Sequence, residues 1–161
     1  MHQEKEYTLV FCRRENPESP GSRQVLLGMK KRGFGVGRWN GYGGKIEEGE
    51  STEVGALREL EEESTIHSAV LNRRGYLVFY MAEDDKYMKV HVYDTWNFSG
   101  EAIETEEMRP RWFCEDELPF DDMWPDDSYW LGQMLSDTRS FIGRFDFEDN
   151  DTITDHTLKF S

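Results

Sequence analysis

The chain has 161 residues, of which 37% are hydrophobic and 14% aromatic, and its 33 acidic and 19 basic residues give a net charge of −14. This length suits one domain, residues 1–161, with a proper core, and the aromatic content argues against disorder. A surface this negative repels phosphate backbones and anionic lipids, so it argues against stable nucleic-acid binding and membrane association.

The termini and cysteines give little sign of secretion. The N-terminal segment has no basic region followed by an apolar one, and no apolar run approaches 18 residues. Two cysteines are too few for a disulfide framework. We therefore expect a protein of a reducing compartment without a membrane span.

The predicted elements contain more strands than helices. Residues 6–13 alternate in a strand pattern, with Tyr7, Leu9 and Phe11 on one face, and an extended surface turn follows at 15–22. Further strands are predicted over residues 24–29, 70–82, 87–98, 109–114, 141–147 and 152–160, with a glycine-rich loop and strand at 33–44 and helices at 52–64 and 126–137. Helices do not alternate with every strand, which predicts an α+β fold: a mixed β-sheet with helices packed on it as an α/β/α sandwich.

Acidic side chains gather on one side of the predicted helix 52–64. At 100° per residue, Leu57 and Leu60, with Val54 nearby, lie on the side expected to face the core. Glu59, Glu62 and Glu63 fall on the opposite side, within an arc of roughly 100°. One interpretation is an ordinary solvated acidic face.

A metal site is the other interpretation of this face. Arg58 points to the side of it, so no basic residue offsets a repulsion of about 0.2–0.5 kcal/mol per carboxylate pair. A hard divalent cation would remove the repulsion. Clustered carboxylate oxygens suit Mg²⁺, with Mn²⁺ as a substitute.

Residues upstream place the glutamates in a spaced motif. Gly44 is followed by Glu50 and then by the segment Arg58-Glu59-Leu60-Glu61-Glu62-Glu63-Ser64-Thr65-Ile66. This spacing resembles the Nudix box, with six matching glycine or polar positions. Thr65 stands where that family has a glycine, at a helix end that often requires a positive φ, so the exact end of the helix is in question.

The glycine-rich loop leads directly into this motif. Six glycines lie within residues 33–44, interleaved with Phe34, Trp39 and Tyr42. Glycines let a backbone approach a ligand closely. Gly44-Lys45 lacks the Ser or Thr of a phosphate-binding P-loop, and the spacing does not fit a dinucleotide fingerprint. The loop is therefore either a flexible connection or a lining of the substrate site.

A third segment carries groups suited to a nucleobase. Trp124 offers a face for stacking, and Asp126 and Asp127 are adjacent carboxyls of which one can retain a proton in an apolar pocket. Such a pair presents both a donor and an acceptor. Asp126 or Asp127 could instead cap the following helix, and the amide of Asn40 could pair with a base or cap a turn.

Together, residues 28–45, the box, residues 106–113 and residues 119–130 resemble the branch of the Nudix family that hydrolyses oxidised purine nucleoside triphosphates. The resemblance implies a Nudix-type sandwich over nearly the whole chain and metal ligands at Gly43, Glu59, Glu62, Glu63 and Glu107. It implies a substrate pocket formed by Thr8, Lys30, Phe34, Asn40, Tyr42, Gly43, Gly44, Lys45, Phe79, Met81, Met88, Trp124, Pro125, Asp126 and Asp127. Met81 replaces a usual aromatic and Tyr42 a usual Phe, which bears on the substrate spectrum.

The resemblance also implies a reaction. A Mg²⁺-dependent monomer would hydrolyse small nucleoside triphosphates such as 8-oxo-dGTP, 2-hydroxy-dATP and methylated purine dNTPs to the monophosphate and pyrophosphate, sanitising the nucleotide pool. Glu63 or Glu107 would take the proton from water, and Arg58 would orient the glutamates. The expected location is the cytoplasm, with mitochondrial or nuclear pools as alternatives.

Two other functions stay open. One is hydrolysis of another diphosphate-linked nucleoside, a dinucleoside polyphosphate or ADP-ribose, by the same helix with a different pocket. The other is a nucleotide-binding Nudix module without turnover, although the full set of glutamates argues against it.

Overall fold

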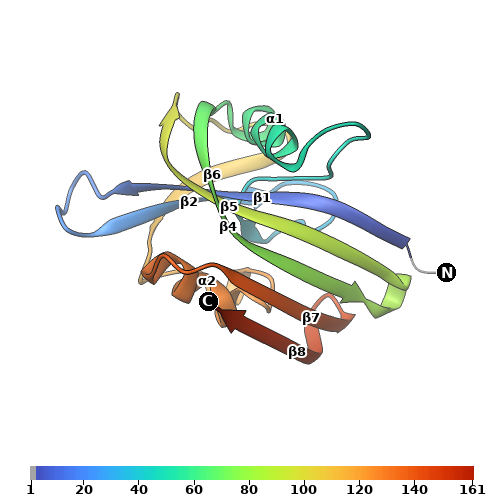
Figure 1. Ribbon diagram of the computed structural model, residues 1–161. Coiled ribbons are helices and arrows are strands. Elements are labelled where there is room, and N and C mark those ends of the chain that lie inside the picture. Colours follow the sequence, from blue (N-terminus) through green and yellow to red (C-terminus); the bar gives the residue numbers. More distant parts are fainter. Residues whose placement is uncertain (1–2) are drawn as a thin grey trace.

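The computed structural model describes residues 3–161, so the first two residues of the predicted domain 1–161 lie outside the described part. This part of the chain forms strands, two α-helices and two short 3₁₀ turns (Figure 1). In chain order the elements are β1 (Gln3–Glu15), β2 (Arg23–Lys30), β3 (Trp39–Asn40), α1 (Thr52–Ser64), β4 (His67–Met81), η1 (Ala82–Asp84), β5 (Lys86–Ser99), β6 (Met108–Cys114), η2 (Phe120–Asp122), α2 (Asp127–Ser136), β7 (Phe141–Asp149) and β8 (Thr152–Phe160).

The strands form one mixed sheet of eight. Its order is β3-β2-β1-β5-β4-β7-β8, with β6 paired to β2. Two pairings are parallel, β1 with β5 and β4 with β7, and the others are antiparallel. The N-terminal strand β1 therefore lies between β2 and β5, far from the edges of the sheet.

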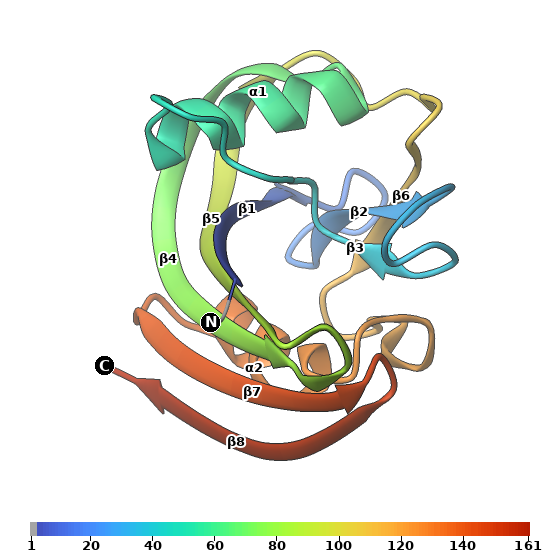
Figure 2. The ribbon, with the colours of Figure 1, turned by 90° about the vertical axis from the view of Figure 1, so that its right-hand side faces the viewer.

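The sheet has a hydrophobic core on each face. Phe11 belongs to the core that contains α2, whereas its neighbours Val10 and Cys12 belong to the core that contains α1. This alternation follows from the two-residue period of a strand. Figure 2 shows α1 against one side of the curved sheet and α2 on the other, near β7 and β8. The predicted α/β/α arrangement and the face assignment of residues 6–13 are confirmed.

Several element boundaries differ from the sequence prediction. β1 extends two to three residues beyond each end of the predicted strand, and β4 begins at His67 instead of residue 70. The glycine-rich segment contributes only the two-residue strand β3, because glycines with positive φ break the extended chain before Trp39. Helix α1 has the predicted bounds, and α2 is one residue shorter at each end.

A buried ionic network fastens the C-terminal end of α2 to the sheet. Asp94 accepts hydrogen bonds from Arg13 (2.9 Å) and Arg74 (2.8 Å). The two guanidinium groups also donate to the carbonyls of Leu135 and Met134, in the last turn of the helix. These cations satisfy carbonyls that a helix end leaves without intrahelical partners. The opposite end of α2 is the end that faces the candidate site.

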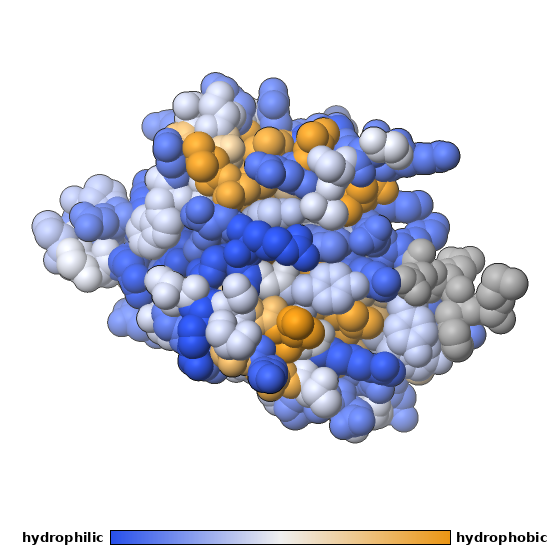
Figure 3. Space-filling model, viewed as in Figure 1, coloured by the Kyte–Doolittle hydropathy of each residue, from blue (hydrophilic) through white to orange (hydrophobic). Residues whose placement is uncertain are grey.

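The outer surface is mainly polar. Figure 3 shows hydrophilic residues over most of one face, with hydrophobic residues in two groups that a hydrophilic band separates. Among residues 3–161, neither helix has the length and apolar composition needed to cross a bilayer.

Candidate active site

Helix α1 presents its acidic edge toward the glycine-rich loop. The helix starts where Ser51 Oγ accepts a hydrogen bond from the Val54 N–H at 3.2 Å, and Ala56 and Leu60 bury its inner face. Val54, expected near the core face, is instead exposed. Glu63, expected on the outer face, is buried beside Leu60 because the loop covers that edge of the helix.

Burial and a hydrogen bond from a backbone N–H both affect the pKa of the Glu63 carboxyl. Its Oε1 accepts a 3.0 Å hydrogen bond from the Gly43 N–H, and Lys30 Nζ lies 3.7 Å from its Oε2. Burial raises the pKa of this carboxyl to about 7, although the Gly43 donor and Lys30 act in the opposite direction. A carboxyl with such a pKa can gain and lose a proton near neutral pH.

Arg58 lies among the acidic side chains, which corrects the interpretation that it points to the side. Its guanidinium donates to Glu59 at 2.9 Å and to Glu62 at 3.3 Å. It also grips Glu50 through two hydrogen bonds of 2.7 and 2.9 Å, and mainly for this reason the pKa of Glu50 falls to about 2. Part of the expected carboxylate repulsion is therefore offset within the protein.

Glu107 approaches the same edge from the segment before β6. Lys30 Nζ lies 3.5 Å from its Oε2, and Arg32 donates to its Oε1, which keeps the pKa of Glu107 below its ordinary value. The segment is held to α1 by Thr105, whose Oγ1 donates to the Glu63 carbonyl at 3.1 Å. Lys30 thus lies between Glu63 and Glu107, two of the predicted metal ligands.

Helix α1 ends in the conformation that a glycine usually provides. Thr65 has φ 71° and ψ 0°, and its N–H donates to the Glu61 carbonyl. Its Oγ1 donates to the Glu101 carbonyl at 2.9 Å. The family position does require a positive φ, and this chain adopts it with a β-branched residue.

Two glycines bring the loop backbone against the site. A Cβ on Gly43 would lie 1.8 Å from the Thr8 carbonyl oxygen, and a Cβ on Gly44 would lie 2.5 Å from the Glu59 carboxyl carbon. Any side chain at Gly44 would therefore press on that carboxylate. The predicted ligands, the Gly43 carbonyl and the carboxylates of Glu59, Glu62, Glu63 and Glu107, are hard oxygen donors of the kind that a divalent cation of the Mg²⁺ class prefers.

A cavity of about 250 Å³ opens beside the acidic edge and extends toward α2. Most of its lining is apolar and aromatic, as is typical of small-molecule sites. Of the predicted substrate residues, it is lined by Thr8, Lys30, Phe34, Asn40, Gly43, Gly44, Phe79, Met81, Met88, Trp124, Asp126 and Asp127. Glu63 lines it too, whereas Glu59, Glu62 and Glu107 lie outside its lining, so one carboxyl of the acidic edge faces the same space as the carboxyl pair.

Three predicted substrate residues lie outside this lining. The backbone of Tyr42 pairs with Val10, which puts its ring in the core on the α1 side, where its hydroxyl is buried without a partner among the described residues. The side chain of Lys45 is exposed, and its carbonyl accepts a hydrogen bond from Arg58. Pro125 belongs to the turn that precedes α2.

The adjacent carboxyls are buried residues of the cavity lining. Asp126 is 3% and Asp127 2% exposed. Instead of capping α2, Asp126 Oδ2 accepts a 2.8 Å hydrogen bond from Nε1 of Trp130, while Asp127 Oδ2 has no partner among the described residues. Burial raises the pKa of Asp126 to about 6 and that of Asp127 well above its ordinary value, the latter with a contribution from Asp126. This pair can hold one proton at neutral pH, as expected from the sequence.

Asn40 braces the loop backbone, and its pairing with a base stays a prediction. It lines the cavity, and its Oδ1 accepts a 2.8 Å hydrogen bond from the Gly41 N–H. Trp124 lines the cavity beside Phe34, with ring centroids 4.9 Å apart.

Sequence reasoning missed several lining residues: Tyr7, Leu9, Gly35, Arg38, Gly41, Val90, Met108, Trp130 and Phe147. Most are apolar residues whose alternation marks only which face of a strand they occupy. Arg38 carried a usable signal, since it is a cation within the glycine loop beside Trp39.

The NUDIX domain family matches residues 8–134. The chain is 49% identical over 137 residues to the oxidized purine nucleoside triphosphate hydrolase of Mus musculus, covering 85% of this chain and 87% of that protein. It is 47% identical over 135 residues to the Danio rerio protein of the same name, covering 84% and 86%. Among solved structures, the MutT protein from Bacillus halodurans superposes with a TM-score of 0.79 and 22% identity, covering 96% of this chain and 97% of that one. The last likeness concerns the fold alone.

Proposed function

The chain belongs to the NUDIX family, and on this basis we propose that it is a hydrolase of oxidised purine nucleoside triphosphates. The observation that carries the proposal is one cavity lined both by Glu63 of α1 and by Asp126 and Asp127 at the start of α2. A purine nucleotide has the matching polarity, with an anionic phosphate chain at one end and hydrogen-bonding base edges at the other.

At the base end, the protein supplies a plane and two carboxyls. Trp124 offers its indole face for stacking, and Met81 and Met88 line the same cavity with adaptable apolar side chains. At neutral pH a protonated Asp127 donates a hydrogen bond and an ionised Asp126 accepts one. Oxidation at a purine ring changes which ring atoms carry hydrogen, so this pair can select a damaged base.

At the phosphate end, the acidic edge would bind the phosphate chain through a cation. Glu59, Glu62, Glu63 and Glu107 would hold Mg²⁺, or Mn²⁺ in its place, which neutralises phosphate charge and polarises the phosphoryl group. Arg58 orients Glu59 and Glu62 through its hydrogen bonds to both. Lys30, between Glu63 and Glu107, contributes a further positive charge beside the phosphates.

Glu63 is the better placed of the two candidate bases. It lines the cavity and is fixed by the Gly43 N–H, whereas Arg32 already occupies an oxygen of Glu107. We infer that Glu63 takes the proton from the attacking water, which releases the nucleoside monophosphate and pyrophosphate.

The test is pyrophosphate release with Mg²⁺ across a panel of nucleotides. It contains dGTP, 8-oxo-dGTP, 2-hydroxy-dATP, methylated purine triphosphates, ADP-ribose and diadenosine polyphosphates. We expect the oxidised purine triphosphates to give the highest kcat/KM. A preference for ADP-ribose or a dinucleoside polyphosphate would assign the pocket to another substrate class.

Glu63→Gln tests the catalytic assignment, with Glu61→Gln on the exposed side of the same helix as its matched control. Glu63→Gln should lower kcat about 10²–10⁴-fold while the thermal unfolding transition is retained, because the amide preserves an acceptor for Gly43. Glu61→Gln should leave kcat unchanged. Near wild-type turnover in Glu63→Gln would overturn the assignment.

A further inference from the structure

Three side chains from two parts of the chain, the glycine-rich loop and β7, contact the indole of Trp124. Phe34 of the glycine loop lies against it with ring centroids 4.9 Å apart, and Phe147 of β7 meets it edge-on at 6.1 Å. The guanidinium carbon of Arg38 lies 4.3 Å from the centre of the indole ring. Arg38 therefore makes a cation–π contact with the residue that we assign to base stacking.

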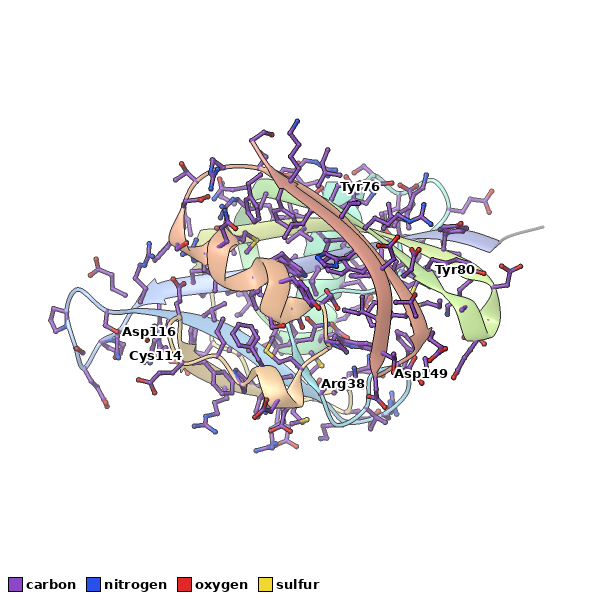
Figure 4. The ribbon with its side chains drawn as sticks, turned by 90° about the horizontal axis from the view of Figure 1, so that it is seen from below. Arg38, Tyr76, Tyr80, Cys114, Asp116 and Asp149 are labelled. Atoms are coloured by element: carbon purple, nitrogen blue, oxygen red, sulfur yellow. The ribbon has the colours of Figure 1, made fainter. Side chains whose placement is uncertain are left out.

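The turn between β7 and β8 binds the guanidinium group of Arg38. One guanidinium nitrogen donates to the Asn150 carbonyl at 3.0 Å, and the other pairs with the carboxylate of Asp151. Asp149 braces the turn, because its Oδ1 accepts a 2.8 Å hydrogen bond from the Asp151 N–H. Figure 4 shows Arg38 and Asp149 close together at this end of the β7–β8 hairpin.

Arg38 and Asp151 differ in how far their side chains are exposed, and only Arg38 lines the cavity. The side chain of Arg38 is 20% exposed and lines the cavity, whereas that of Asp151 is 82% exposed and lies outside its lining. A contact between a turn carboxylate and a cavity-lining guanidinium can therefore act on the site without the turn touching a ligand.

The contact between Arg38 and the β7–β8 turn matters because the backbone of the glycine-rich loop is little restricted by itself. Arg38 is joined to β2 through its carbonyl, which accepts a hydrogen bond from the Lys30 N–H at 3.1 Å. The segment just before it contains Gly33, Gly35 and Gly37, all with positive φ. Glycine restricts the backbone least, so the side chains of Arg38 and Phe34, which both contact Trp124, tie this segment to the far wall of the site.

We propose that Arg38, Asn150 and Asp151 form a clasp that fixes the indole plane of Trp124 and thereby sets the preference for oxidised over undamaged purines. The proposal rests on the proposed function, since Trp124 is taken as the stacking platform. Trp124 lies two residues before Asp126, so a tilt of the indole changes how a stacked base meets the carboxyl pair. Arg38 and Asp151 are positioning residues in this account.

The experiment compares four variants with the wild-type protein. Asp151→Asn removes the charge of the clasp outside the cavity, Arg38→Met removes the guanidinium, and the double variant combines the two. Asp151→Glu serves as the conservative rescue. The matched control is Asp155→Asn, an exposed acidic residue on the neighbouring strand β8.

Kinetics give the first measurement. Asp151→Asn should lower the ratio of kcat/KM for 8-oxo-dGTP over dGTP about two- to fivefold, through a higher KM for the oxidised substrate and with kcat unchanged. Because Asp151 acts through Arg38, the double variant should be no worse than Arg38→Met alone. Asp151→Glu should restore the ratio, and Asp155→Asn should not alter it. Additive losses, or a ratio unchanged in Asp151→Asn, would overturn the clasp.

A spectroscopic measurement keeps the clasp distinct from the proposed function. In protein labelled with 5-fluorotryptophan, the ¹⁹F signal of Trp124 is assigned by its loss in Trp124→Phe. That signal should shift in Arg38→Met and in Asp151→Asn but not in Asp155→Asn. A wild-type protein without activity on purine triphosphates would refute the proposed function alone. A Trp124 signal that stays in place in both clasp variants would refute the clasp, whatever the activity.

Discussion

Asp126 directly precedes α2 and Trp130 lies in its first turn, where the buried indole N–H of Trp130 donates a 2.8 Å hydrogen bond to Oδ2 of Asp126. This bond favours the ionised form of Asp126, whereas nothing among the described residues meets Oδ2 of Asp127. The two carboxyls are adjacent in sequence but differ in their partners, so the pair is built to carry one proton and one charge.

The first prediction concerns the pH dependence of base selection. The pKa of Asp126 is about 6 and that of Asp127 is raised further above its ordinary value, so the pair gains a second proton as the pH falls through about 6. The acceptor is then lost, so the ratio of kcat/KM for 8-oxo-dGTP over that for dGTP should fall on that acidic limb, whereas protonation of Glu63 lowers kcat/KM for both substrates alike. Asp126→Asn cannot titrate and should flatten the limb while lowering the plateau. Steady-state kinetics from pH 5 to 9 measure both, and an unaltered limb in the variant would assign it to another group.

The second prediction concerns stability, which the same carboxyl pair should lower as the pH rises, whereas base selection is lost as the pH falls. A folded-state pKa raised above the unfolded value means that stability is present in full below the unfolded pKa and is lost as the pH rises through the folded pKa. For Asp127, burial makes ionisation costly in the folded state. Asp127→Asn should therefore increase the free energy of unfolding by about 1–3 kcal/mol at pH 8, with the gain vanishing near pH 4. Urea unfolding at the two pH values tests this, and an equal gain at both would show that charge is not the cause.

The end of α1 offers a test of backbone strain. Thr65 has φ 71°, a conformation that costs a side-chain-bearing residue about 1–2 kcal/mol and glycine almost nothing. Thr65→Gly and Thr65→Ala both lose the hydroxyl bond to Glu101, so their difference isolates the backbone. After the entropy that glycine gains in the unfolded chain, the glycine variant should be more stable by about 1 kcal/mol. Thermal unfolding compares them, and an alanine variant of equal stability would contradict the strain.

Adding a methyl group at Gly44 should lower activity, whereas adding one at Gly43 should lower stability. At Gly44 the Cβ would meet the end of the Glu59 side chain, which can move, so Gly44→Ala should fold and lose about ten- to a hundredfold in kcat. At Gly43 the Cβ would meet the backbone of Thr8, so Gly43→Ala should lose stability first. Gly132→Ala, with open space around its Cβ, is the control and should be neutral or stabilising. Activity and melting temperature of the three variants separate these outcomes, and a fully active Gly44→Ala would contradict the role of this close approach to Glu59.

Local sequence patterns predicted much of the fold. The two-residue period of β1 assigned Tyr7 and Phe11 to one face, and the spacing around Glu59 and Glu63 located the acidic helix. Periodicity could not show that Glu63 is buried, because the burial comes from Gly43, twenty residues earlier in the chain. An isolated helix wheel describes a helix in solvent and omits what packs on it.

Long-range contacts account for the remaining differences. The position of Arg38 in the site is defined by its contacts with Trp124 and Asp151, which are 86 and 113 residues further along the chain. The family resemblance places Tyr42 in the pocket, but its pairing with Val10 turns its ring into the core. Such pairings depend on the register of distant strands, which local propensity does not specify.

The place of β1 in the sheet has a consequence for synthesis on the ribosome. Its parallel partner β5 begins at Lys86, so β1 leaves the exit tunnel long before that partner exists. At bacterial or eukaryotic elongation rates of about 5–20 residues per second, a nascent chain carries this strand for roughly 4–16 s with one edge open. During that interval the apolar side chains of β1 are available to chaperones, and release from them must await translation of the second half of the protein.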